Sequence, residues 1–295
     1  MIFDLKKNNI SLAKALYLAN EYDVIYLDDK EYFEKVIVKT PNITIKGRSN
    51  SIINFNANNG SIIPKGLGGD GVKKYGTTGS ATLTISTSAR GFHMENVTVV
   101  NSYNNGLNDR SGRQAVAFKS EISDLFINNC RFIGNQDTLY VDYGSNNYII
   151  NSYIEGDVDF IFGSADCYFI NCNIYAKKSN KSYYIAPNTY NNNSYGLVFI
   201  KCIFTKAIET ECYLGRWWFP NKSLLPIDPK ASFIECKFKG NIIMEVIRMH
   251  EEDIGTGRLL VKASTINDEI ININNDDSLC NSIMKNEGDI SDKLS

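Results

Sequence analysis

One short stretch, Phe169-Ile170-Asn171-Cys172-Asn173-Ile174, consists of an apolar strand, a polar turn and a second strand. Cys130, Ser152, Cys202 and Cys236 take the place of Cys172 in similar stretches, and successive copies are 22, 20, 30 and 34 residues apart. Repeats of roughly 20 to 50 residues are typical of solenoids, and strand-rich units without helical periodicity indicate a parallel β-helix. The pattern recurs at 93–99, 126–132, 149–154, 199–204 and 233–238.

The uneven intervals are interpreted as loops that leave a stack of coils, and such loops often form a binding face. The four cysteines at equivalent positions are expected to stack as small interior side chains. A ladder of disulfides is the less favoured alternative, because nothing in the sequence indicates an oxidising compartment. Asn128, Asn151 and Asn171 are expected to form a ladder along the turns.

The two ends of the chain differ from the repeats. Residues 11–20 are predicted to form a short amphipathic helix, with Ser11 as its N-cap, that covers the first coil. Residues 56–79, rich in Gly and Asn, are expected to be a long loop. Periodicity fades after Val261, and the polar residues 281–295 are expected to be a frayed tail of a single β-helix domain covering residues 1–295.

Composition excludes several classes of function. The net charge of −2 over 295 residues leaves no basic field for nucleic acid. No apolar run is long enough to span a membrane, and no signal peptide is visible, so a cytoplasmic protein is expected, or a secreted one if the chain was trimmed. With only His93 and His250, and no CxxC motif, neither a metal site nor any cofactor is expected.

Two acids lie in marked settings. Asp137 belongs to Gly134-Asn135-Gln136-Asp137-Thr138-Leu139-Tyr140, and Asp159 is followed by Phe160-Ile161-Phe162 and so enters an apolar strand. Aspartate is rarely buried without a partner. A separation of 22 residues, about one coil, predicts an acid–base or nucleophile pair.

Four unusual segments are predicted to fall on successive coils and to meet on one face. Together they supply two amides, two carboxylates, a guanidinium group and aromatic surface. The segments are 114–118 (QAVAF), 136–139 (QDTL), 159–163 (DFIFG) and 214–218 (LGRWW).

In order and spacing, these segments resemble those of the pectin methylesterases, carbohydrate esterase family 8. The segment 31–36 (EYFEKV), the Ser-Ala-Thr of 80–82 and Gly91-Phe92 resemble further elements of that family. The resemblance implies a right-handed parallel β-helix that demethylates homogalacturonan. One departure is Trp217, which stands where the family has Pro, and a bulky ring near the site is expected to reshape a subsite.

The resemblance also implies roles for individual residues. Asp159 would be the nucleophile and Asp137 the general acid and base, Gln114 and Gln136 would stabilise the oxyanion, and Arg216 would keep Asp159 ionised. Trp218, Tyr140, Val158 and Phe162 would line the sugar site. Free galacturonate carboxylates could meet Arg110, Arg113, Lys177, Lys178 and Lys181.

Other interpretations stay open. Asp159 and Arg216 could be only a buried ion pair, and Asp157 is expected to be a solvated turn residue. The expected substrate is methylated homogalacturonan or its short oligomers, acted on by a monomer. The alternatives are a related esterase or thioesterase acting on a substrate such as acyl-CoA, a galacturonan lyase or hydrolase, and a non-catalytic sugar-binding solenoid.

Overall fold

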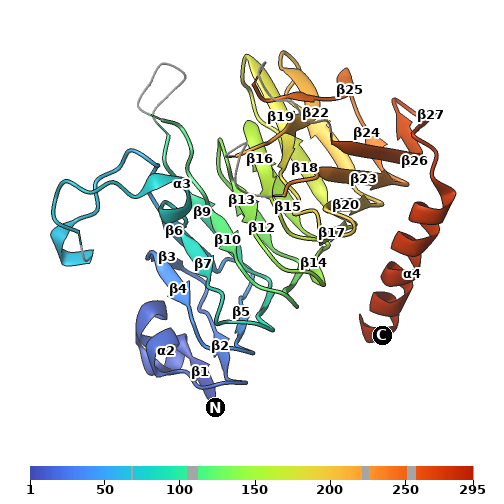
Figure 1. The fold of residues 1–295 in the computed structure, drawn as a ribbon. Helices are drawn as coiled ribbons and strands as arrows, with labels where there is room; N and C mark the ends of the chain where they lie inside the picture. Colours follow the sequence, from blue (N-terminus) through green and yellow to red (C-terminus); the bar gives the residue numbers. More distant parts are fainter. Residues whose placement is uncertain (68, 105–111, 221–225, 251–256, 295) are drawn as a thin grey trace.

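The computed structural model describes residues 1–67, 69–104, 112–220, 226–250 and 257–294. The chain winds into stacked coils whose short strands pair in parallel with those of the coils before and after (Figure 1). It is therefore the parallel β-helix predicted from the repeats, with the right-handed winding that the family resemblance implied. One side of the stack is a sheet made of β4 (Val36–Val38), β7 (Leu83–Ile85), β10 (Phe118–Ser120), β13 (Leu139–Val141), β16 (Val158–Gly163), β19 (Lys181–Pro187), β22 (Glu211–Trp217) and β25 (Ile242–Arg248).

Two further ladders complete each coil, and β26 ends both of them. The first contains β1 (Ile2–Asp4), β2 (Val24–Tyr26), β5 (Thr44–Lys46), β8 (His93–Glu95), β11 (Phe126–Asn128), β14 (Asn147–Ile150), β17 (Cys167–Ile170), β20 (Leu197–Ile200), β23 (Lys230–Ile234) and β26 (Arg258–Ile266). The second contains β3 (Glu31–Phe33), β6 (Ile52–Phe55), β9 (Thr98–Asn101), β12 (Arg131–Ile133), β15 (Tyr153–Gly156), β18 (Asn173–Ala176), β21 (Ile203–Lys206) and β24 (Lys237–Phe238). The last strand, β27 (Glu269–Ile273), pairs antiparallel with β26.

The sharp turn between these two ladders explains the recurring asparagines. Asn96, Asn129, Asn151 and Asn171 each have a left-handed backbone, with φ between 51° and 58°. Asparagine tolerates this conformation better than most residues, so it suits the turn. Amides also bond from coil to coil, and Asn151 Nδ2 donates to Asn128 Oδ1 at 3.0 Å. The expected ladder is confirmed there, although Asn128 is the last residue of β11 and Asn129 makes the turn itself.

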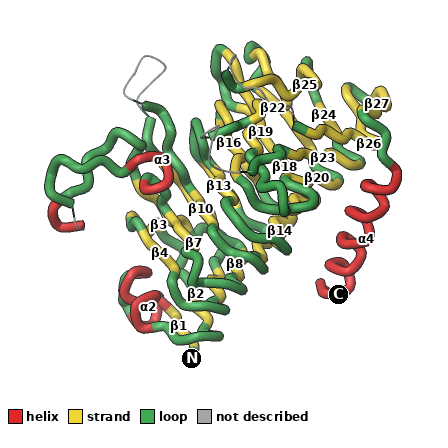
Figure 2. Tube along the Cα trace, in the orientation of Figure 1, coloured by secondary structure: helices red, strands yellow, loops and turns green. Residues whose placement is uncertain are grey.

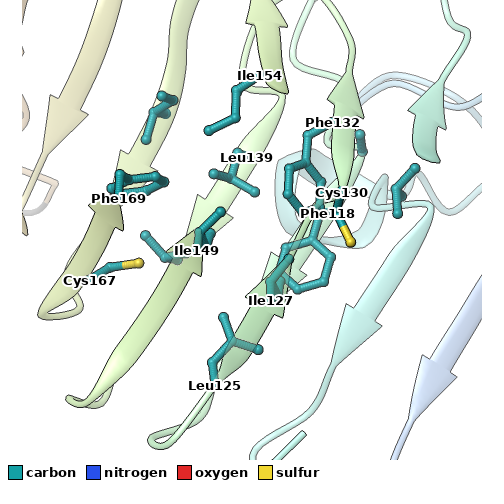
Figure 3. Close-up of a cluster of buried hydrophobic side chains, with 14 of the residues drawn as sticks. Phe118, Leu125, Ile127, Cys130, Phe132, Leu139, Ile149, Ile154, Cys167 and Phe169 are labelled. Atoms are coloured by element: carbon teal, nitrogen blue, oxygen red, sulfur yellow. The ribbon is translucent and has the colours of Figure 1, made fainter. Parts of the chain in front are cut away.

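The interior of the stack is apolar, and most of the cysteines belong to it (Figure 3). All seven are free and buried; the four at equivalent positions lie in the interior as expected, while Cys280 packs against the outside of the stack. Cys172, Cys202 and Cys236 each donate an S–H bond, at 3.2 to 3.4 Å, to a carbonyl one coil earlier. Burial raises the pKa of Cys130 to about 12, so its thiol stays neutral. The alternative of a disulfide ladder is therefore wrong, because all seven cysteines are free.

The N-terminal helix covers the first coil as predicted. After α1 (Leu5–Asn8), α2 (Leu12–Leu18) begins at Ser11, whose hydroxyl accepts from the N–H of Lys14 at 3.1 Å. Glu34 adds a second cap, because its carboxylate accepts from the N–H groups of Leu12 and Ala13 at 3.1 and 2.8 Å. The expected loop at 56–79 contains two short turns of helix, η1 (Lys65–Leu67) and α3 (Gly76–Gly79).

The C-terminal segment differs from the prediction. Instead of a frayed tail at 281–295, the chain forms the helix α4 (Asp277–Leu294), which lies beside the stack (Figures 1 and 2). Cys280 and Ile283 are buried against an apolar patch on the outer face of the first ladder. Asn286 also donates to the Tyr168 hydroxyl at 2.9 Å. A helix with few apolar residues at helical spacing can pack here, because the sheet supplies the rest of the apolar contact.

No helix in the described ranges is both long enough and apolar enough to cross a membrane.

Candidate active site

Asp137 and Asp159 occupy equivalent places on neighbouring coils. Leu139 pairs with Ile161, and each acid lies two residues earlier. Neighbouring parallel strands lie about 4.8 Å apart, so the 22-residue separation becomes one coil step. Both acids have left-handed backbones, with φ of 65° and 51°, and an irregularity in strand register falls between Val158 and Ile161. Such irregularities often direct a side chain at a functional site.

Arg216 reaches Asp159 from two coils further along the stack. Its Nε donates to Asp159 Oδ1 at 3.0 Å, and one terminal NH₂ group donates to Oδ2. The guanidinium group lies over the Tyr183 ring, 4.4 Å from the ring centroid. A forked hydrogen bond supported by a flat ring fixes both the position and the charge of Asp159.

The two buried carboxyls have different electrostatic surroundings. Burial and the charge of Asp159 hold the pKa of Asp137 well above its usual range, although Arg216 opposes the rise. Burial also raises the pKa of Asp159, but the hydrogen bonds and charge of Arg216 oppose that rise directly. Two neighbouring carboxylates repel each other, so the pKa values of such a pair move apart. Of the two, Asp137 has the more strongly raised pKa, and Arg216 favours the anionic form of Asp159.

Two amide side chains border the carboxyls. The Gln136 side chain lies near Asp137 and slightly opposes the rise in the pKa of that carboxyl. Gln114 lies on the preceding coil, where the next residue, Ala115, donates its N–H to the Gln136 carbonyl at 3.1 Å. The Gln114 Oε1 accepts from Asn59 Nδ2 at 2.6 Å, so its NH₂ group is the part left to donate. The two glutamines therefore fall on neighbouring coils, and their role toward an oxyanion stays a prediction.

An aromatic cluster lies along the coils from the acids, with Tyr140 and Phe162 buried and Trp218 half-buried. The Tyr140 and Phe162 rings are stacked with centroids 4.3 Å apart, and the Trp218 ring lies 5.8 Å from Phe162. Small side chains, including Val116 and Ala186, complete this outer patch. Val158 is half-buried at the start of β16. The structure thus brings together Tyr140, Phe162 and Trp218.

Trp217 is not in this cluster. Its side chain is buried in the interior of the stack, and its ring lies so close to Gly257 that a Cβ there would approach ring atoms to 2.3 Å. The prediction that this ring reshapes a subsite is wrong, because alternation along β22 directs Arg216 outward and Trp217 inward.

The expectation for Asp157 is also wrong. This side chain is buried, with 3% of its surface exposed, and it forms an ion pair with Arg113. The other bases expected to meet substrate carboxylates are paired with acids of the protein. Lys177 lies 3.6 Å from Glu155, Lys178 2.8 Å from Glu209 and Lys181 3.2 Å from Glu211, and Arg110 lies outside the described residues.

Sequence reasoning missed Asn59, Tyr183 and the pairing of Arg113 with Asp157. Tyr183 follows Asp159 by about one coil, so the repeat could have indicated it. Asn59 comes from the loop at 56–79, outside the repeat, and no spacing signal marks it.

Within the described ranges, no three His, Cys, Asp or Glu side chains are grouped so that they could hold a metal ion. The grouped side chains are a carboxyl oriented by an arginine, a second carboxyl with a strongly raised pKa, and nearby amides. That set suits attack on a carbonyl carbon, with a covalent acyl intermediate and a developing oxyanion.

The chain matches the family model described as Pectinesterase over residues 6–225. A pectinesterase of Sitophilus oryzae is 34% identical over 157 residues, which is 49% of this chain and 40% of the relative. A pectin methylesterase from Yersinia enterocolitica has a TM-score of 0.73 at 27% identity, covering 89% of this chain and 92% of that one. A pectin methylesterase in complex with a hexasaccharide has a TM-score of 0.74 at 22% identity, covering 95% and 93%.

The chain spans less than half the length of the first curated relatives that it matches. The family model nevertheless covers most of the chain, and the solved structures share its fold throughout. The chain belongs to the pectinesterase family.

Proposed function

We propose that this protein is a pectin methylesterase, which hydrolyses the C6 methyl esters of galacturonan and releases methanol. The observation that carries the proposal is the forked hydrogen bond from Arg216 to Asp159, next to the proton-holding Asp137. A buried ion pair alone would not require a second acid with a raised pKa, nor two amides beside it.

In the proposed reaction, a carboxylate oxygen of Asp159 attacks the ester carbonyl and forms a tetrahedral oxyanion. Gln114 and Gln136 donate hydrogen bonds to that oxyanion. Asp137 gives its proton to the methoxy oxygen, the C–O bond breaks and methanol leaves, so Asp159 is now acylated. Asp137, now an anion, takes a proton from water, which attacks the acyl carbonyl and releases Asp159.

The aromatic cluster supports a sugar polymer as the substrate. Trp218 offers a half-buried ring that packs against the buried rings of Phe162 and Tyr140, and the C–H faces of pyranose rings pack on aromatic rings. One relative was solved in complex with a hexasaccharide, which supports an oligosaccharide ligand here. Methylated galacturonan or its oligomers are therefore proposed as the substrate, with Val158 as a further contact. A monomer is proposed, since one chain supplies all of these groups.

The direct test measures methanol release from methylated pectin and from methylated oligogalacturonides, with the wild type and Asp159→Ala. Loss of the nucleophile is expected to lower kcat at least about 1,000-fold. Asp124→Ala is a matched control, because this acid pairs with Arg90 at the surface. Methanol release that survives Asp159→Ala would refute the assigned nucleophile.

The same assay separates the other candidate functions. Thioester hydrolysis without methanol release would indicate a thioesterase, chain cleavage would indicate a lyase or hydrolase, and binding without turnover would indicate a sugar-binding solenoid. Trp217, where the chain departs from the family pattern, lies in the interior and so gives no support to a different substrate such as a thioester.

A further inference from the structure

Arg113 and Asp157 form an ion pair that crosses the site. Arg113 directly precedes Gln114, before β10, and Asp157 lies two residues before Asp159. The coil between them carries Gln136 and Asp137. The exposed fractions of the two side chains are 25% for Arg113 and 5% for Asp157. The contact therefore joins the first and third of three successive coils, over the coil that holds the acid.

Backbone hydrogen bonds place Asp157 within the same framework. Its N–H donates to the carbonyl of Asn135 at 3.1 Å, and its Oδ1 accepts from Val158 N–H at 2.7 Å. The carbonyl of Val158 in turn accepts from the N–H of Asp137 at 3.0 Å. Asp157 is thus fixed on both sides, and Arg113 is the partner that reaches it from the coil of Gln114.

We propose that Arg113 and Asp157 are a positioning pair, which ties the coil of Gln114 to the coil of Asp159 and sets the pH above which Asp137 loses its proton. The proposal rests on the function proposed above. Neither residue has a role in the reaction steps, and each acts through its neighbours.

The charges that surround Asp157 make this pair an electrostatic control. Arg113 faces it from the segment before β10, Asp137 from the segment before β13, Asp159 from β16 and Arg216 from β22, while Lys177 and Glu155 pair with each other nearby. Burial and Asp159 raise the pKa of Asp137 most, and the negative charge of Asp157 adds to that rise. The positive charge of Arg113 is expected to offset part of this effect, so removing Asp157 should lower the pKa of Asp137 and removing Arg113 should raise it.

The experiment compares pH profiles of methanol release. In the wild type, the alkaline limb of kcat falls as Asp137 loses its proton. Asp157→Asn keeps an acceptor for Val158 but removes the negative charge, so this limb should move down by about 0.5 to 1 pH unit. Arg113→Met leaves Asp157 charged and unpaired, so the limb should move up by about the same amount. Arg113→Lys restores the charge and should return the limb toward the wild-type position.

Controls separate this proposal from its alternatives. Arg90→Met removes a surface ion pair with Asp124 and should leave the profile unchanged. Circular dichroism confirms that each variant is folded before its profile is compared. If the alkaline limb stays at its wild-type pH in both site variants, the pair does not set the proton loss of Asp137 and the proposal is wrong. If the wild type releases no methanol at all, the proposed function is wrong. That result differs from an active enzyme whose pH profile does not change in the variants.

Discussion

Asp137 is a buried carboxyl that the fold prefers to keep protonated. Its pKa in the folded protein is raised above the unfolded value of about 3.9, by burial first and then by Asp159. The stability that this group contributes is therefore fully present below about pH 4. That contribution is lost as the pH rises through the raised, folded-state pKa.

This linkage gives a prediction for Asp137→Asn, which keeps the shape and removes the charge. The variant should match the wild type in Tm near pH 4 and exceed it as the pH rises, by about 2 to 4 °C for each kcal/mol of lost repulsion. Thermal unfolding followed by circular dichroism from pH 4 to 9 measures the difference. Parallel curves for the two proteins would contradict the raised pKa, and the variant should also lose methanol release.

At this scale the sequence predicted the position of each main group but not every contact between them. Asp137, Asp159 and Arg216 were predictable because their spacing follows the coil. The pairing of Arg113 with Asp157 was not, because it depends on how one long side chain extends over a whole coil. The orientation of Trp217 was also missed, although strand alternation from Arg216 would have indicated it.

Among the elements, the short helix α2 depends on a residue outside itself. Glu34 caps the N–H groups of Leu12 and Ala13, and the side chain of Leu12 is fully buried at the end of the stack. A carboxylate at a helix N-terminus satisfies unpaired donors and interacts favourably with the helix dipole. The glutamate of the segment 31–36 is therefore explained by capping rather than by catalysis.

Glu34→Ala should lower the free energy of unfolding by about 1 to 2 kcal/mol, because two N–H groups lose their acceptor. Urea denaturation measures the change. Methanol release should keep its kcat, because α2 lies at the end of the stack, away from the acids (Figure 1). Glu31→Ala is the control, since Glu31 is exposed on a strand and bonds only the Asn54 amide among the contacts described. An equal loss in both variants would contradict the capping role.

The elements show where sequence periodicity stops being informative. The strands and α2 were predictable, because each has its own apolar pattern or capping residue. The helix α4 was not, because most of its sequence is polar and its apolar contact comes from Ile170, Ile200 and Leu260 of the sheet.

For the whole molecule, α4 covers an apolar patch that the stack alone would leave open. Ile283 is fully buried there, together with Val198, Ile200 and Ile234. An uncovered patch of this kind on a sheet favours association between molecules. The helix thus closes the outer face of the solenoid, on a different ladder from the one that carries the acids.

Ile283→Ala should lower the free energy of unfolding by about 2 to 4 kcal/mol through lost burial and a cavity. Chemical denaturation and light scattering measure stability and association together. Lys285→Ala, on the exposed side of α4, should change neither. If Ile283→Ala unfolds like the wild type, the helix does not stabilise the stack in solution.

The global fold was predictable because one repeat, read six times along the chain, has only one way to bury its apolar side. That the chain forms a single domain over residues 1–295 stays a prediction.

The seven buried thiols have a consequence for recovering the protein after denaturation. While the coils are stacked, every thiol is shielded, and no disulfide has to form for the fold to be complete. Once the chain opens, all seven become accessible to oxidants, and an odd number cannot pair within one molecule. Oxidative refolding would therefore trap wrong crosslinks and join chains to one another, so a reducing buffer is the condition under which the native stack can re-form.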